Sequence, residues 1–299
     1  MLRLAVTTAA ETLDRIREPL AARGIEARHL RAKQRSIRVS AGSSGEKGRR
    51  SAACTDEFDV GFVYPSRLME GATIDARLSI PWVNGRDAVV VSRNKAGVLA
   101  TLDVAGVPVP KTTMISNPVD DAAVTDAVDA FSFPVVVKPN STTRGVGVAK
   151  AMDLDSLLGI IDYLDLVHDY RATGDKSYLI QEFLPDARDY RAMVVGGEYA
   201  GAVRRELPDD ALAEGRWKHN VHRGADATGV ELDDHARDLA ERTAEALGID
   251  YLGVDLLETD DRILVNETNA RPTIDHETKY VPDFYDRLGA LIKRTAEGQ

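Results

Sequence analysis

Two apolar segments near the end of the chain, each with an acidic residue inside it, constrain the fold more than any other feature. Residues 251–258 and 262–267 are separated by a short polar segment at 259–261, which predicts a β-hairpin. A turn centred on Asp261 places Asp255 directly opposite Glu267. Like charges that face each other destabilise a sheet unless something neutralises them.

A divalent cation is one such neutralising group. Glu267 and Asn269 are two residues apart, so on an extended strand their side chains point to the same side. Two carboxylates and an amide oxygen are hard ligands of the kind that Mg²⁺ prefers. The alternative is a hairpin with solvated acids, which Asp260 and Asp261 fit as ordinary turn residues. Asp255 and Glu267 fit it less well because apolar residues flank them, but spacing alone leaves both interpretations open.

A lysine beside a glycine-containing loop is a second candidate site. Lys138 ends the β-branched segment 133–138, and Gly145 and Gly147 follow within the loop 141–147. A lysine near backbone N–H groups that glycine exposes suits a polyphosphate. The loop matches neither a P-loop nor a dinucleotide-binding fingerprint. A surface lysine next to a turn is therefore the simpler interpretation of this segment alone.

Three arginines, Arg191, Arg223 and Arg271, recur beside the expected strands. The guanidinium group binds carboxylate and phosphate through several donors and keeps its charge. Each arginine alone suits a surface ion pair. Arg271 also suits a phosphate contact, because it follows Glu267 and Asn269 and would reach a phosphate held by the same metal.

The pattern of elements predicts three modules and no internal repeat. A strand at 2–7, a helix at 11–23 and a buried parallel strand at 59–64 indicate an α/β unit of about 90 residues. The other expected elements are helices at 95–105, 120–130, 154–165 and 233–247, extended segments at 110–115, 133–138 and 178–183, and hairpins that turn at 196–197 and 259–261.

Composition excludes several classes of function. The chain has 299 residues, long for one core, and its 48 acidic against 38 basic residues give a net charge of −10. This balance argues against a nucleic-acid partner and against an anionic membrane. The Ser/Gly/Arg-rich segment 40–51 has no interleaved aromatics and is interpreted as a solvated loop. No apolar run approaches the roughly 20 residues of a membrane helix, and a single cysteine excludes an internal disulfide framework, so we expect a cytoplasmic protein.

Taken together, the motifs resemble the ATP-grasp superfamily and, within it, the RimK-like carboxylate–amine (glutamate) ligases. The resemblance runs in order from about residue 93 to residue 272 and covers the first third only through its strand–helix pattern. The segments that carry it are Asn94-Lys95, 105–112, 135–139, 181–183, 189–191, 194–197, 217–224, 253–257 and 265–269.

The resemblance implies an α/β (α+β) ATP-grasp architecture. An N-terminal pre-ATP-grasp domain would span 1–92, a central lid subdomain 93–180, and a C-terminal subdomain with the metal site 181–299, the last two clamping ATP. The implied activity is ATP-dependent formation of an amide or peptide bond through an acyl phosphate. Glutamate or another small amino acid would be added to a carboxylate acceptor, either a small molecule or a peptide. A homo-oligomer remains open.

The resemblance also implies roles for individual residues. Lys95 and Lys138 would contact ATP from two sides, with Ser141, Gly145 and Gly147 in a loop over its phosphates. The adenine hinge would contain Gln181, Glu182 and Phe183, with Asp189 near the ribose. Mg²⁺, or Mn²⁺ as an alternative, would be held by Asp255, Glu267 and Asn269. The residues facing phosphate and the substrate carboxylate would be Arg191, Asn220, Arg223 and Arg271.

Two rival functions and one departure from the family pattern stay open at this point. A non-catalytic ATP-binding sensor or scaffold would use the same cleft, although it could lose one of the metal ligands or lysines, all of which are present. An enzyme that activates bicarbonate or formate would normally carry additional domains. Arg271-Pro272 stands where relatives often have small residues and glycine, which leaves the acceptor geometry undetermined.

Overall fold

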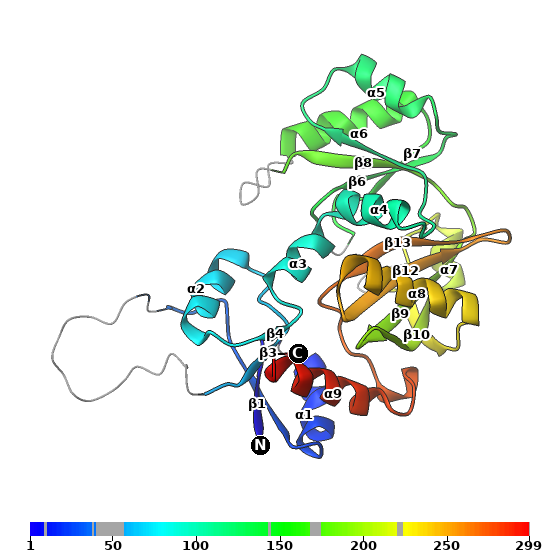
Figure 1. The fold of residues 1–299 in the computed structure, drawn as a ribbon. Helices are drawn as coiled ribbons and strands as arrows, with labels where there is room; N and C mark the ends of the chain where they lie inside the picture. The colour runs from blue at the N-terminus through cyan, green and yellow to red at the C-terminus, as the bar shows by residue number, and fades with distance from the viewer. Residues whose placement is uncertain are drawn as a thin grey trace.

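The computed structural model describes residues 1–8, 11–37, 39, 57–142, 145–167, 175–219 and 224–298. Within them the chain forms three sheets of four, four and five strands, which Figure 1 shows as three groups of elements. The segment 40–51, interpreted from its composition as a solvated loop, lies outside the described residues. Within the described parts, no helix is both long enough and apolar enough to cross a bilayer.

The first sheet is parallel and has the strand order β2-β1-β3-β4. Its strands are β1 (Leu2–Val6), β2 (Ile25–His29), β3 (Val60–Phe62) and β4 (Trp82–Val83), and the helices α1 (Glu11–Ala21), α2 (Leu68–Leu78) and α3 (Arg86–Arg93) belong to the same part of the chain. The expected helix after β1 is confirmed, with Leu13, Ile16 and Leu20 on its buried side and Pro19 within it. The elements β2, β4, α2 and α3 were not predicted.

The end of the chain returns to this first sheet. Helix α9 (Phe284–Ala296) lies against α1, β3 and β4, as Figure 1 shows for the red helix beside the blue strands. Leu288 and Ile292 of α9 share a buried cluster with Leu4 and Val60. The first and last parts of the chain are therefore joined by a common apolar core.

The second sheet is antiparallel and has the order β5-β8-β6-β7. Its strands are β5 (Thr112–Ser116), β6 (Val135–Pro139), β7 (Ala149–Ala151) and β8 (Ser177–Glu182), with helices α5 (Asp121–Val128) and α6 (Leu154–Val167). Alternation along β6 sends Val135 and Val137 into the core with these helices. Val136 and Lys138 therefore belong to the opposite face, which α5 and α6 do not cover.

The third sheet has the order β11-β10-β9-β12-β13. Its strands are β9 (Arg188–Val195), β10 (Glu198–Glu206), β11 (Asp226–Val230), β12 (Tyr251–Glu258) and β13 (Ile263–Asn269), and the accompanying elements are α4 (Lys95–Val104), α7 (Asp209–Ala213), α8 (Asp234–Leu247) and η2 (Glu277–Lys279). Helix α8 begins after Asp233, whose carboxylate accepts from the Ala236 N–H, and it ends at Gly248. The sequence-based bounds of this helix are confirmed to within one residue.

Both predicted hairpins form. The first turns at Gly196 and Gly197, which adopt φ values of 68° and 85° that favour glycine. In the second, Asp255 does pair with Glu267, as the turn position predicts. The prediction is wrong for the pairs nearer the turn. The register shifts by one residue after Asp255, so Leu256 pairs with Val265 and not with Asn266. A β-bulge therefore restores the Asp255–Glu267 pair.

Candidate active site

Two buried lysines from different elements lie beside the same segment of β13. Lys138, at the end of β6, donates from Nζ to Gln181 Oε1 at 3.0 Å and to Asn266 Oδ1 at 3.4 Å. Lys95, the first residue of α4, has its Nζ 3.6 Å from Glu267 Oε1. The two ammonium groups thus bracket consecutive residues of the third sheet.

The environment of Lys138 disfavours its charge. Burial lowers the pKa of Lys138 to about 8; Glu267 opposes this shift and the positive charge of Lys95 adds to it. Its hydrogen-bond partners are amide oxygens, and no described carboxylate pairs with it directly. A buried cation with neutral partners is ready to bind an anion, so Lys138 fits a phosphate contact.

Asn140 fixes the position of Lys95. Its side-chain oxygen accepts from the Ala96 N–H at 2.9 Å, and its Nδ2 donates to Asn94 Oδ1 at 3.0 Å. Lys95 Nζ donates to the carbonyl oxygens of Asn140, at 3.3 Å, and Thr142. The sequence motif Asn94-Lys95 is therefore held against the strand end that carries Lys138. Asn140 itself was missed, although its position two residues after Lys138 is a usable signal.

The loop after β6 has features that suit a ligand. The Ser141 hydroxyl is buried and has no hydrogen-bond partner among the described residues. Gly145 and Gly147 have φ values of 65° and 75°. A Cβ on Gly147 would lie 2.7 Å from Pro139 Cγ. A buried hydroxyl without a partner is expected to bind a ligand or a water molecule. The three expected loop residues lie in the segment that directly follows the strand end with Lys138.

A four-charge cluster lies on one face of the third sheet. Asp255 on β12 accepts from Arg191 Nε at 2.7 Å and from Arg191 Nη2 at 2.8 Å. Arg205 Nη2 lies 3.2 Å from Asp255 Oδ2, and Arg205 Nε donates to Asp189 Oδ1 at 2.8 Å. Alternation along the paired strands β10, β9, β12 and β13 places these four side chains and Glu267 on the same face.

The cluster gives its two aspartates different proton affinities. Burial raises the pKa of Asp255, but the charges of Arg191 and Arg205 outweigh burial and hold that pKa at about 2. Burial raises the pKa of Asp189 to about 6, and the charge of Arg205 offsets only part of this rise. Asp255 is therefore a permanent carboxylate whose neutralisation comes from arginine in this structure.

The three expected metal ligands differ in how well they fit a cation. Both oxygens of Asp255 are engaged by arginine. Glu267 is half-exposed, with Lys95 at 3.6 Å from Oε1, and Asn269 Oδ1 accepts from the Arg271 N–H at 2.8 Å. Among the described residues, no group of three or more His, Cys, Asp or Glu is placed to hold a metal. Glu267 and Asn269 keep oxygen lone pairs that suit Mg²⁺.

The expected hinge is held by its own polar contacts. Gln181 is buried and its Nε2 donates to Thr112 Oγ1 at 2.9 Å. The Glu182 carboxylate accepts from the Lys111 N–H and from Arg262 Nη2, each at 2.7 Å. Arg262 directly precedes β13 in the last hairpin, so Glu182 joins the second sheet to the third.

An aromatic–lysine cluster lies next to this hinge. The ring of Phe183 meets that of Trp217 edge-on at 5.7 Å. Lys150 Nζ lies 4.6 Å from the Phe183 centroid and 5.6 Å from the Trp217 centroid, within cation–π range. Residues 216–219 form neither a helix nor a strand. Asn220 and Arg223 lie outside the described residues.

Arg271 is directed toward the first sheet. Its Nη1 donates to Tyr64 O and to Thr7 Oγ1 at 3.2 Å, and its Nη2 donates to Thr8 Oγ1 at 3.0 Å. Within the described residues it forms no hydrogen bond or ion pair with Lys138 or Glu267. Arg271 therefore extends the site toward the N-terminal part of the chain.

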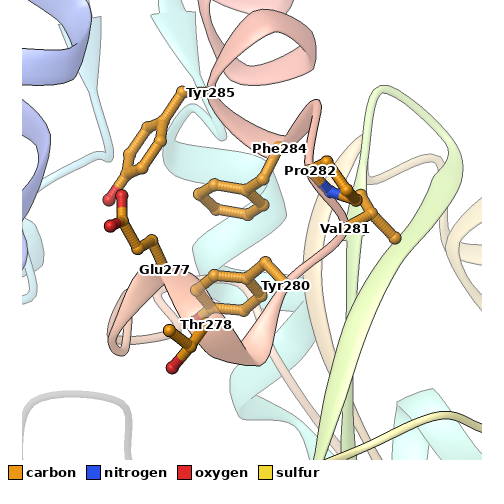
Figure 2. A pocket seen from close by; sticks show the side chains of 7 residues that line it. All are labelled: Glu277, Thr278, Tyr280, Val281, Pro282, Phe284 and Tyr285. Carbon is orange, nitrogen blue, oxygen red and sulfur yellow. The ribbon is translucent and has the colours of Figure 1, made fainter.

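A separate aromatic pocket of about 280 Å³ lies at the start of α9 (Figure 2). Tyr280 and Phe284 stack there with centroids 4.2 Å apart. The residues that line it are Glu277, Thr278, Tyr280, Val281, Pro282, Phe284 and Tyr285. None of them belongs to the lysine pair or to the four-charge cluster, so this pocket is not the candidate active site.

Comparison with known proteins agrees with this geometry. Residues 92–283 match the model of the RimK-like ATP-grasp domain. A probable alpha-L-glutamate ligase of Klebsiella pneumoniae is 31% identical over 72% of this chain and 68% of its own length. An alpha-aminoadipate–LysW ligase, LysX, of Sulfurisphaera tokodaii is 30% identical over 69% of both chains.

A solved structure supports the fold. The ATP-grasp ligase PsnB complexed with a minimal precursor, Mg and ADP has a TM-score of 0.64 at 19% identity, covering 98% of this chain and 97% of that chain. The α/β fold class and the resemblance stated from the motifs are thereby confirmed. The chain belongs to the RimK-like ATP-grasp family, and it is an ATP-dependent ligase.

Proposed function

We propose that this ligase joins an amine to a carboxylate through an acyl-phosphate intermediate. The amine donor is glutamate or another small amino acid, by analogy with the relatives named as glutamate ligases. The acceptor is a carboxylate on a small molecule, a peptide or a carrier, as the name of the LysX relative suggests. The segments 93–180 and 181–299 form the two halves of the clamp around ATP, and 1–92 forms the third module.

One observation carries the proposal: two buried lysines from separate elements bracket the β13 segment that contains Glu267. Lys95 and Lys138 bring two positive charges into a buried space whose other described partners are mostly neutral oxygens. Such a site is suited to the phosphates of a nucleotide. The orphaned Ser141 hydroxyl and the Gly145–Gly147 loop lie beside it and supply further donors.

The reaction follows from these groups without a protein nucleophile. An acceptor carboxylate oxygen bonds to the γ-phosphorus of ATP while the bond to the β-phosphate oxygen breaks, releasing ADP. The amine nitrogen then bonds to the activated carbonyl carbon, phosphate departs, and the amine loses a proton. Lys95 and Lys138 neutralise the charge that spreads over the transferred group.

Glu267 and Asn269 are the residues best placed to hold Mg²⁺, which when bound supplies charge neutralisation at the phosphates. Asp255 orients Arg191 toward the same face of the sheet. It would join the metal shell only where its arginine contacts are exchanged. Asp255 therefore supports the site through electrostatics in the structure described.

The test is ADP release by the purified protein with ATP and Mg²⁺ across a matrix of amino acids and carboxylates, with mass spectrometry of the products. We expect ADP release that needs both an amine and a carboxylate, and a product whose mass equals their sum less one water. Nucleotide binding without any substrate-dependent ADP release would favour a sensor and overturn the proposal. A bicarbonate-dependent reaction without an organic acid would also overturn it.

A further inference from the structure

The first sheet offers a binding edge that the ATP site does not use. Its strand order is β2-β1-β3-β4, so β1 lies beside β3. From β1 the chain first adds β2 on one side and then β3 on the other, so the order of the parallel strands reverses between β1 and β3. In open parallel sheets, ligands bind outside the carboxyl ends of the strands at such a switch point. Thr7 and Thr8 follow β1, and Val63 and Tyr64 follow β3, so these residues line that edge.

A guanidinium from the far end of the chain lies at this edge. Arg271, two residues after β13, donates to Thr7 Oγ1, Thr8 Oγ1 and the carbonyl oxygen of Tyr64. Thr7 Oγ1 in turn donates to Val63 O at 2.6 Å, which ties the ends of β1 and β3 together. The edge therefore presents a positive group that the first sheet itself does not supply.

This positive charge has no anionic partner. Within the described residues, the acceptors of Arg271 are all neutral oxygens, and none is a carboxylate. Burial and, to a smaller extent, the positive charge of Arg93 lower the pKa of Arg271 to about 10. Arg93 donates to Ser66 O and forms no ion pair within the described part of the chain. Two neighbouring guanidinium groups without an acid are costly unless an anion joins them.

Arg271 retains donors for such an anion. A guanidinium has five N–H groups, and the described acceptors engage Nη1 and one position of Nη2. The Nε–H and a second Nη2 hydrogen have no acceptor among the described residues. Nε and Nη2 lie on one edge of the guanidinium, and this edge can bind a carboxylate through two hydrogen bonds. The Thr8 hydroxyl accepts from Arg271, and its own hydrogen has no acceptor among the described residues.

We propose that Arg271, flanked by Thr8 and Arg93, binds a carboxylate group of the substrate other than the one that reacts. This inference rests on the proposed ligase function and narrows the substrate class to acids with a second carboxylate. The phosphates of ATP are a different source of negative charge. They are assigned to Lys95 and Lys138, which have no described contact with Arg271.

The experiment is isothermal titration calorimetry on the full chain, first with Mg-ADP and then, at saturating Mg-ADP, with succinate, glutarate and adipate. Each dicarboxylate is matched to its monoamide, which differs by one charged group. We expect at least one dicarboxylate to bind about 10-fold or more tightly than its monoamide, since hydrogen bonds to a charged group are stronger than those to a neutral amide. No preference in any pair would overturn the inference.

Variants locate the effect. R271Q is expected to weaken binding of the preferred dicarboxylate by about 10- to 100-fold and to leave Mg-ADP binding within about twofold. R93Q is expected to weaken it by a smaller factor, and R67Q, at an exposed arginine paired with Glu70, is the matched control without effect. Unchanged dicarboxylate binding in R271Q would refute the inference.

The outcomes distinguish failure of the proposed ligase function from failure of the role of Arg271. Absence of Mg-ADP binding to the wild-type chain would overturn the proposed function. Normal Mg-ADP binding without discrimination between dicarboxylate and monoamide would overturn only the role of Arg271. If R271Q does not fold, the wild-type comparison and R93Q still decide the question. Equal weakening of nucleotide and dicarboxylate in R271Q would assign Arg271 to the ATP phosphates and overturn the inference.

Discussion

Arg191 and Asp255 face each other across β9 and β12 and form a two-pronged ion pair, with distances of 2.7 and 2.8 Å. Asp255 is buried, and Arg205 approaches it from the other side at 3.2 Å. The pair therefore holds together the middle of the third sheet, directly beside Glu267. Its charge balance governs both the stability of that sheet and the field at the active site.

Removing one member of this cluster should be costly. D255N leaves Arg191 and Arg205 facing a neutral amide, and an unbalanced buried charge costs about 3–5 kcal/mol. We expect a loss of that size in the free energy of unfolding, measured with urea. E258Q, on the same strand at a more exposed pair with Arg188, should leave unfolding nearly unchanged. Equal effects of both variants would contradict the interpretation.

Substitution of Glu267 tests the metal site with less effect on folding than substitution of Asp255. The Glu267 side chain is half-exposed and its cationic neighbour is 3.6 Å away, so E267Q should fold normally. Because a metal ligand contributes charge stabilisation of several kcal/mol to phosphoryl transfer, we expect ADP formation to fall by about 100-fold or more. D261N, in the exposed turn, is the control. Full turnover in E267Q would exclude Glu267 as a ligand.

The lowered pKa of Lys138 predicts a pH dependence of nucleotide binding. Below pH 8 the ammonium is charged and attracts phosphate, and above pH 8 it loses its proton in the free protein. Bound phosphate favours the charged form. Affinity for ADP should therefore decrease as the pH rises from 7 to 9.5, which fluorescence titration would measure. K138Q should bind more weakly and show a flatter profile, and a flat wild-type profile would contradict this.

Local periodicity and turn chemistry predicted much of the site. The hairpin at β12 and β13 and the pairing of Asp255 with Glu267 follow from alternation and a turn position. The bulge beside them does not, because nothing local distinguishes Asn266 as the extra residue. The Asp189–Arg205 pair was missed although these residues pair across the first hairpin. The turn at Gly196 and Gly197 would by itself pair Asp189 with Arg204, and a register shift between Tyr199 and Ala202 makes Arg205 the partner.

Contacts between segments that are far apart in the sequence could not be predicted from local periodicity and turns. Lys150 over Phe183 and Trp217, or Arg271 at the ends of β1 and β3, depend on how the three sheets meet. The parallel edge strands β2 and β4 were also missed; they have only five and two residues. The motif resemblance supplied the family, but it could not show that Asp255 is engaged by two arginines.

Gly147 tests the loop beside the lysines. Its φ of 75° disfavours any other residue, and a Cβ would lie 2.7 Å from Pro139. G147A should therefore destabilise the chain by about 1–3 kcal/mol and weaken ADP binding, both measurable by thermal unfolding with and without nucleotide. G159A, in α6 with open space around its Cβ position, should be neutral or stabilising. Indistinguishable behaviour of the two variants would argue against a constrained loop.

Asn84 joins the first sheet to the end of β13. Its Nδ2 donates to the carbonyl oxygens of Tyr251 and of Ala270, the latter at 2.7 Å, and its backbone has φ of 52°. Ala270 directly follows Asn269, so this amide fixes one expected metal ligand and the start of Arg271.

Two substitutions separate the contributions of the Asn84 side chain and backbone. N84G keeps the backbone conformation and leaves two buried carbonyl groups without their donor, which should cost about 1–3 kcal/mol. N84A should cost about 1 kcal/mol more, because alanine disfavours a positive φ. Urea unfolding measures both, and the apparent Mg²⁺ requirement for ADP release should rise in N84G because Asn269 loses its support. An N84G variant with wild-type stability and Mg²⁺ dependence would show that the amide does not position this strand end.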